Sequence, residues 1–197
     1  MLDVQVIENP AAAAVALDAI RSRLLSELAE PASAADLAGR LGIARQKLNY
    51  HLRALEANGL VRVAEQRRWG GLTERKLVAT ASSYVVSPGA FGPVAADPAR
   101  TRDRLSASYL IALGARVVRE VNELIRRSNE AGQYLATLSL DTEIRFRTAA
   151  ERAAFSRELT EAITGLASKY HDVAAPGGRP HRVLVMAHPV PIKEEEE

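Results

Sequence analysis

The chain has 197 residues, of which 47% are hydrophobic, and it contains four histidines and no cysteine. This length suits one large domain or two small ones, and the apolar share excludes disorder over most of the chain. The lack of cysteine excludes disulfides, thiol redox switches and thiolate metal sites. The first residues include Asp3 and Glu8 but no basic residue. They match neither a signal peptide nor a membrane span, so we expect a cytoplasmic protein without a membrane partner.

The net charge of +2 conceals an uneven distribution. Residues 36–80 include nine basic and four acidic residues, a net charge of +5, whereas residues 83–197 are neutral overall. Concentrated positive charge indicates a polyanionic partner. A solvated basic surface is the alternative that charge alone leaves open.

The first predicted helices precede the basic region. Residues 10–29 are predicted to form one helix, which has a proline in its first turn and is stopped by Pro31. A shorter helix follows at about residues 34–41, with a capping box of Ser33 and Asp36 at its start.

The helix predicted at about residues 45–58 is amphipathic. One face carries Leu48, Leu52 and Leu55, and the opposite face carries Gln46, Asn49, Tyr50, Arg53 and Ala57. Gly59 suits a left-handed position just past the helix, where Leu60 can fold back onto Leu55. The two helices, joined by a glycine-containing turn at residues 42–44, form a helix-turn-helix.

A hairpin is predicted after this helix. Residues 60–65 and 73–81 form its two strands, and the loop between them reads Arg67-Arg68-Trp69-Gly70-Gly71. A helix-turn-helix followed by a basic hairpin is a winged helix. Three roles remain open for Trp69, namely packing at the wing base, a sugar contact and a ligand contact.

The central segment resembles a known family. Its residues are Leu41-Gly42-Ile43 and then Leu48-Asn49-Tyr50-His51-Leu52-Arg53-Ala54-Leu55-Glu56-Ala57-Asn58-Gly59-Leu60-Val61. They resemble the ArsR-type winged-helix repressors, in which a His-Leu-Arg-x-Leu run leads into a Gly-Leu-Val strand start. The resemblance covers residues 12–82 and implies a winged-helix fold and DNA binding. One departure is Ala44, which stands where such proteins place a Ser or Thr N-cap. Losing that cap costs about 1 kcal/mol, and we expect a looser first turn until a phosphate or DNA orders it.

The predicted DNA contacts lie on the polar helix face and at the wing tip. Amides such as those of Asn49 and Gln46 suit adenine, and Arg53 can reach guanine or phosphate. An exposed side chain that makes no DNA contact is the alternative for each position. The full predicted set is Arg45, Gln46, Lys47, Asn49, Tyr50 and Arg53 for the major groove and backbone, and Arg67 and Arg68 for the minor groove.

A proline- and glycine-rich linker is predicted at residues 83–99, before a long helix at residues 100–131. The apolar stripe of this helix is wider than one seam needs, and about thirty residues span about 45 Å. We therefore expect it to pair with the same helix of a second subunit, although an intramolecular core is the alternative. The predicted dimerisation residues are Leu110, Leu113, Val117, Val121 and Leu124.

The remainder is predicted to be a strand-helix-strand unit at residues 136–190. Residues 136–147 alternate apolar and polar side chains, a capping box opens the helix at Thr148, and residues 182–188 are apolar on both faces. Two strands alone are marginal in water, so they would join others, from a partner subunit, or pack on the long helix. The acidic tail, residues 193–197, is expected to be solvated.

The predicted fold class is α+β, with an N-terminal winged helix-turn-helix domain, a long dimerisation helix and a small C-terminal strand-helix-strand unit. The predicted domains are residues 1–82 for DNA binding, residues 83–99 as the linker, and residues 100–197 for dimerisation and a possible effector.

No metal site, cofactor or enzymatic activity is expected. The long helix has no histidine, and the four histidines are scattered among other elements. The sequence has neither a nucleophile motif nor a phosphate-binding glycine loop. We expect a homodimeric repressor that binds double-stranded DNA at a pseudo-palindromic operator, with room for a non-metal small-molecule effector. The alternatives are a winged helix used for protein interaction, or a small-molecule-binding C-terminal domain with a nonspecific DNA anchor.

Overall fold

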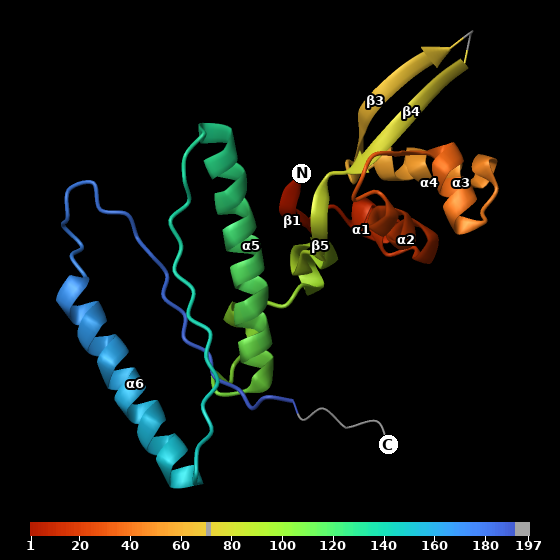
Figure 1. Ribbon diagram of the computed structural model, residues 1–197. Helices are drawn as coiled ribbons and strands as arrows, with labels where there is room; N and C mark the ends of the chain where they lie inside the picture. Colours follow the sequence, from red (N-terminus) through yellow and green to blue (C-terminus); the bar gives the residue numbers. More distant parts are fainter. Residues whose placement is uncertain (70–71, 192–197) are drawn as a thin grey trace. The chain divides into compact units, whose positions relative to one another are not determined.

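The computed structural model describes residues 1–69 and 72–191 (Figure 1). The chain divides into two compact units, residues 1–135 and the residues from 136 onward. Helices and strands are both present, and the predicted α+β class is confirmed. Across the described residues, no helix is both long and apolar enough to cross a bilayer.

The first unit contains most of the regular structure. Its elements are β1 (Leu2–Ile7), α1 (Pro10–Ala16), α2 (Ala19–Glu27), β2 (Ala32–Ser33), α3 (Ala34–Leu41), α4 (Arg45–Ala57), β3 (Val61–Trp69), β4 (Leu72–Ala79), β5 (Ala81–Val86), the 3-10 helices η1 (Pro88–Val94) and η2 (Pro98–Arg100), and α5 (Ala107–Ala131). The second unit contains α6 (Ala149–Tyr170).

The single helix predicted at residues 10–29 is two helices. Asp18 caps α2, and its side chain accepts hydrogen bonds from the backbone N–H groups of Ile20 and Arg21 at 3.1 and 3.0 Å. The bond from the Arg21 N–H is the main cause that lowers the pKa of Asp18. A short carboxylate that binds nearby backbone donors competes with helix continuation, which explains the break after α1.

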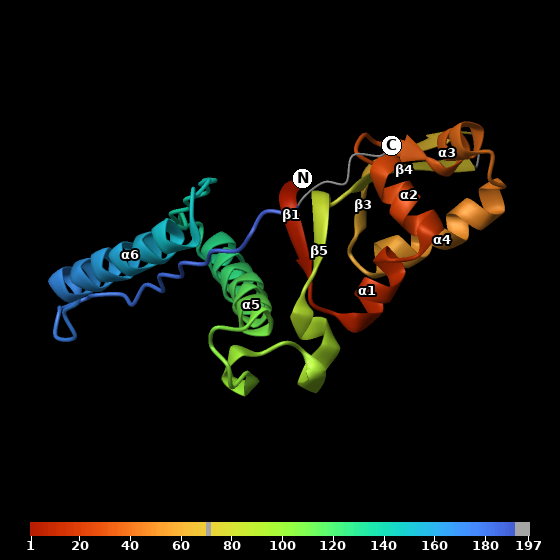
Figure 2. The same ribbon diagram turned by 90° about the horizontal axis from the view of Figure 1, so that it is seen from below.

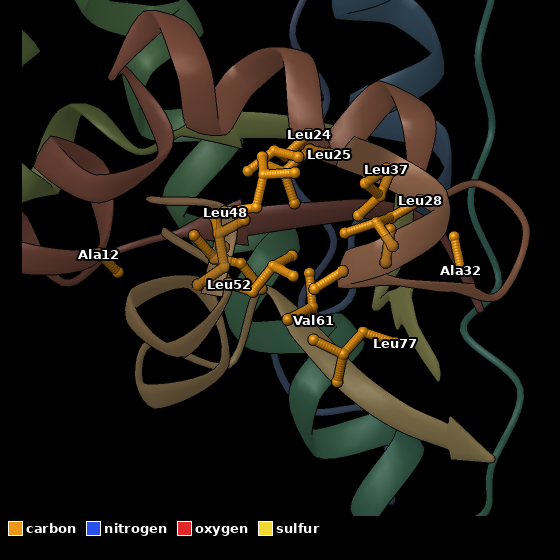
Figure 3. Close-up of a cluster of buried hydrophobic side chains, with 14 of the residues drawn as sticks. Ala12, Leu24, Leu25, Leu28, Ala32, Leu37, Leu48, Leu52, Val61 and Leu77 are labelled. Atoms are coloured by element: carbon orange, nitrogen blue, oxygen red, sulfur yellow. The ribbon is translucent and has the colours of Figure 1, made fainter. Parts of the chain in front are cut away.

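A leucine core holds the winged helix together (Figure 3). Leu24 of α2 and Leu28, the C-cap residue of that helix, meet Leu37 of α3 and Leu48 of α4, and all four are fully buried. Val61 of β3 and Leu77 of β4 close the same cluster from the sheet. Truncating one such leucine to alanine costs about 2–5 kcal/mol, so this cluster fixes the orientation of α4.

The wing is a long hairpin in the antiparallel sheet β2-β4-β3. Strands β3 and β4 pair from Val61 opposite Ala79 to Trp69 opposite Leu72, with a bulge between Val63 and Glu65. The predicted hairpin is therefore present. Its first strand continues to Trp69, whereas the predicted strand ends at residue 65. The loop residues Gly70 and Gly71 lie outside the described residues.

A second, two-stranded sheet was not predicted. Strand β1 pairs in parallel with β5, from Leu2 opposite Ala81 to Ile7 opposite Val86, and the two strands lie side by side in Figures 1 and 2. The Thr80 hydroxyl, just before β5, donates to Leu60 O at 2.9 Å, and the Tyr84 hydroxyl donates to the same carbonyl at 2.8 Å. The predicted linker at residues 83–99 therefore begins inside a strand and continues as η1 and η2.

Helix α5 is shorter than predicted. It begins at Ala107, where Ser106 caps it and accepts the Tyr109 N–H at 3.1 Å, and it ends at Gly132 with φ 60°. Its 25 residues correspond to about 38 Å, against the 45 Å expected. Arg119 donates to Ala96 O at 3.1 Å and Asn122 donates to Glu8 Oε1 at 3.0 Å. These contacts place α5 in the first unit, so the structure divides the chain after Leu135 and not at the predicted linker.

The second unit contains one helix and no strand among its described residues. The predicted cap of α6 is present, because Thr148 Oγ1 accepts the Glu151 N–H at 3.1 Å. The segments 136–147 and 182–188 are non-regular, and the predicted strand-helix-strand unit is corrected to a helix with irregular flanks. Alternation reports which faces are apolar, but a strand also needs a hydrogen-bonded neighbour, which neither segment has here. The acidic tail at residues 193–197 lies outside the described residues.

Candidate nucleic-acid interface

Helix α4 is preceded by a tight turn that holds it against α3. Ser33 and Asp36 form the predicted capping box of α3, in which the Ser33 N–H donates to Asp36 Oδ2 at 2.9 Å and the Asp36 N–H donates to Ser33 Oγ at 3.2 Å. Gly42 ends α3 with φ 66°, a left-handed conformation that favours glycine. The chain then enters α4 at Ala44.

The two ends of α4 differ in their capping. Ala44 makes no side-chain cap, as predicted. At the other end, Gly59 has φ 67°, Leu60 N–H donates to Leu55 O, and Gly59 N–H donates to Glu56 O, both at 3.0 Å. This pair of bonds is the predicted Schellman end. The helix is thus fixed at its C-terminal end and free of a side-chain cap at the end that would lead into DNA.

The two faces of α4 separate as the sequence predicts. Leu48, Leu52 and Leu55 are buried, together with His51. The predicted contact residues Arg45, Gln46, Lys47, Asn49, Tyr50 and Arg53 are all exposed, and Tyr50 keeps 66% of its surface free. Neither ring nitrogen of His51 has a hydrogen-bond partner within the described residues, and its ring packs edge-on against Tyr50 at 5.3 Å. His51 is therefore a packing residue in this structure.

Five of the predicted residues surround one surface hollow. The hollow has a volume of about 480 Å³ and is lined by Arg45, Gln46, Asn49, Tyr50 and Arg53. Two guanidinium groups, two amides and a phenol meet there. Amides and guanidinium groups can bind base edges bidentately, and guanidinium groups also bind phosphates. Lys47 is exposed but does not line the hollow.

The wing residues have different electrostatic surroundings. Arg67 Nη2 lies 3.6 Å from Glu65 Oε2, which also lies 3.8 Å from Lys76 Nζ. Arg68 is exposed and forms no ion pair with any part of the chain that the structure describes. Exposed pairs such as Arg67–Glu65 contribute little to stability, so both arginines stay free to meet phosphate.

An ion pair that was not predicted from the sequence connects the wing to α4. Arg75 Nη2 of β4 donates to Glu56 Oε1 of α4 at 2.5 Å. Neither residue was predicted as functional, because sequence spacing does not show which side chain of a strand faces a helix.

A cleft of about 230 Å³ accompanies this ion pair. Arg45, Asn49, Arg53 and Glu56 of α4 line it, as do Ser33 to Ala35 and residues of β4. The cleft shares Arg45, Asn49 and Arg53 with the hollow on α4, so the hollow and the cleft are parts of one polar surface. Among the described residues, no group of three potential metal-ligating side chains is assembled anywhere.

Comparison with known proteins agrees with this geometry. Residues 17–64 match the family model for a helix-turn-helix domain, a range that begins just before α2 and ends in β3. The chain carries a helix-turn-helix domain. The ArsR-type motif at residues 41–61 lies within the matched range.

The other comparisons add less. An ArsR-like transcriptional regulator from Rhodococcus sp. RHA1 is 22% identical to this chain, over 82% of this chain and 91% of that one, with a TM-score of 0.30. No curated protein matches the chain.

Proposed function

We propose that the protein is a DNA-binding transcriptional regulator, a homodimeric repressor that binds a pseudo-palindromic operator with α4 in the major groove. The observation that carries this proposal is the hollow on α4, which gathers Arg45, Gln46, Asn49, Tyr50 and Arg53 on the face opposite the buried leucines. Recognition helices use this arrangement, because one face must pack while the other reads base edges.

The proposed roles follow from side-chain chemistry. Gln46 and Asn49 bind adenine through their amides, and Arg53 binds guanine or phosphate. Arg45, Lys47 and Tyr50 hold the backbone and fix the register of the helix. Arg67 and Arg68 contact the flanking minor groove or its phosphates.

Dimerisation is proposed to use α5. Leu110, Val117 and Leu124 recur at seven-residue intervals, with Val121 at the intermediate seam position. Leu110, Leu113, Val117 and Val121 are half-buried within the chain, and Leu124 is 47% exposed. Apolar side chains left in water forgo the free energy that burial provides, so a second copy of α5 is the proposed partner. Two-fold symmetry then places two copies of α4 about one helical turn apart on the duplex.

Any effector is proposed to be a non-metal compound. The chain has no cysteine, and α5 has no histidine, so soft-metal ligands are missing from the helix proposed to form the dimer. We propose a cytoplasmic location, because a protein that binds an operator acts where the chromosome lies.

The test is selection of binding sites from a randomised duplex pool by the full-length protein. We expect a two-fold symmetric site and a steep loss of affinity with salt, because several phosphates are neutralised. Gln46→Ala, Asn49→Ala and Arg53→Ala should each lose about 1–3 kcal/mol of binding free energy. Arg157→Ala, at an exposed position of α6, is the charge control and should bind like the parent. Failure to enrich any sequence would refute sequence-specific binding.

The dimer is tested separately by sedimentation equilibrium. Leu124→Glu places a charge in the proposed seam and should shift the protein toward monomer. Leu105→Glu is the matched control, because Leu105 precedes α5 and is 97% exposed. Equal masses for the two variants, both dimeric or both monomeric, would contradict the α5 seam.

A further inference from the structure

The ion pair between Glu56 and Arg75 joins two elements that the proposed function assigns to different grooves of DNA. Glu56 lies in the last turn of α4, and Arg75 lies on β4 opposite Gln66 of β3. The two side chains are 30% and 42% exposed and meet at 2.5 Å. Two other wing cations, Arg67 and Lys76, bind Glu65 within the wing itself. The Glu56–Arg75 pair is thus an electrostatic link between the recognition helix and the wing.

The cleft beside this pair has the chemistry of an anion-binding surface. Arg45 and Arg53 reach it from α4, and Thr73 and Arg75 reach it from β4. Its acidic lining residues are Glu56 and Glu74, and Glu56 already binds Arg75. A guanidinium has five N–H donors, so Arg75 keeps donors available for a second, anionic partner while one of them binds Glu56.

The geometry of B-DNA suggests which anion enters the cleft. A major groove and the adjacent minor groove are separated by one sugar–phosphate backbone. A protein that inserts a helix into the first groove and a hairpin into the second must therefore accommodate that backbone between the two elements. In this chain, the space between α4 and β4 is the arginine-lined cleft.

We propose that the Glu56–Arg75 pair sets the position of the wing relative to α4, and that the cleft beside it receives the DNA backbone phosphate between the two grooves. Glu56 is a positioning residue in this proposal, because it acts through Arg75. Arg75, Arg45 and Arg53 contact the phosphate. The inference rests on the proposed function, and it adds residues that determine how the wing reads the bases flanking the operator half-site.

A carboxylate near DNA repels phosphate. The proposal therefore predicts opposite effects of removing the Glu56 charge on overall affinity and on the preference for flanking bases. Removing the charge of Glu56 removes repulsion and should leave overall affinity unchanged or increased. The same change releases the wing, so preference for flanking bases should fall by on the order of tenfold, the size of coupling that contacting residues show. A residue with only a structural role would not separate these two quantities.

The experiment compares Glu56→Gln with Glu65→Gln. Both variants remove one carboxylate charge, but Glu65 pairs with Arg67 and Lys76, which belong to the wing itself. Hydroxyl-radical footprints and base preferences of the selected operator are measured for both. We expect Glu56→Gln to lose protection and preference at the flanks while the central positions persist, and Arg75→Gln to behave alike. Flanks that stay protected and selective in Glu56→Gln would overturn the proposal.

A measurement without DNA separates this proposal from the proposed function. The chain has no cysteine, so spin labels can be placed at Gly39→Cys and Gln66→Cys, which are exposed positions on α3 and β3 outside the cleft. Pulsed dipolar spectroscopy should show a broader distance distribution in Glu56→Gln than in the parent, and no broadening in Glu65→Gln. Unchanged widths would refute the positioning role even if DNA binding is confirmed. Broadening in a protein that selects no operator would instead refute the proposed function, and with it the phosphate assignment, while the link itself would stand.

Discussion

Ala44→Ser should stabilise the protein, because Ala44 occupies the N-cap of α4 and provides no side-chain acceptor. The first N–H groups of an α-helix have no intrahelical partner. Ala44 has a non-helical backbone, with φ −54° and ψ 131°, as an N-cap residue requires. The serine hydroxyl would accept from the N–H of Gln46 or Lys47.

The expected gain is about 1 kcal/mol of unfolding free energy. With a urea dependence of about 2 kcal/mol/M, the unfolding midpoint should rise by about 0.5 M. The same free energy corresponds to roughly fivefold slower amide exchange at Gln46 or Lys47, if exchange there occurs by opening of the first turn.

The assay is urea unfolding followed by far-ultraviolet circular dichroism, with amide exchange as the local readout. Ala57→Ser is the matched control, because Ala57 is an exposed residue at the other end of α4 and serine there lowers helix propensity without adding an N-cap. The reasoning is refuted if Ala44→Ser has no higher midpoint than Ala57→Ser.

Three further changes test other parts of the first unit. Leu48→Ala removes a fully buried side chain and should lower unfolding free energy by about 2–5 kcal/mol in the same urea assay; a loss below 1 kcal/mol would contradict the core. Thr80→Val removes the hydroxyl that contacts Gln5 Oε1 of β1 at 2.6 Å and Leu60 O at 2.9 Å, and should lose about 1 kcal/mol of unfolding free energy and speed amide exchange in β1, whereas unchanged exchange would count against the contact with β1. The Ser33 N–H, which donates to the Asp36 carboxylate, lowers the pKa of Asp36 below its usual value, so the stabilisation from this bond is complete above the unfolded-state pKa and is lost as pH falls through the folded-state pKa. Asp36→Asn should therefore flatten the acid side of a plot of urea midpoint against pH, and an unaltered acid limb would argue against the capping box as the source.

The parts of the fold that the sequence predicted are those encoded by neighbouring residues. The Ser33 capping box, the uncapped start at Ala44 and the Schellman end at Gly59 each depend on residues within one or two turns of each other. The amphipathic pattern of α4 likewise depends on a single helix. Local signals of this kind are independent of the rest of the chain, so they survive folding unchanged.

The missed features depend on residues far apart in the chain. The pairing of Leu2 with Ala81 in the β1–β5 sheet joins strands separated by most of the first unit, and no local pattern indicates it. Asp18 was missed as a cap because the apolar residues on both sides of it continue the helical spacing. At residues 136–147 the pattern was read correctly as alternating, but alternation does not supply a neighbouring strand.

The candidate site likewise combines features encoded by neighbouring residues with features that depend on residues far apart in the chain. The polar face of α4 was predictable because one helix presents it, and the hollow gathers five of the predicted residues. The Glu56–Arg75 pair was not predictable, because it depends on how a strand 19 residues further along the chain approaches the helix. Its two partners look like ordinary surface charges in the sequence.

The contacts around the Schellman end suggest how the rest of the first unit acts on α4. Asn122 of α5 binds Glu8, which follows β1, and Gln5 of β1 donates to Gly59 O at 3.4 Å. A short chain of contacts thus links the helix proposed for dimerisation to the C-terminal end of the recognition helix. Because α4 is a rigid rod of about 20 Å, a tilt of 10° about that end would move its other end by about 3 Å. That displacement is comparable to the length of a hydrogen bond, so a modest shift of α5 against β1 would take Gln46 and Asn49 out of register with the base edges that we propose they contact.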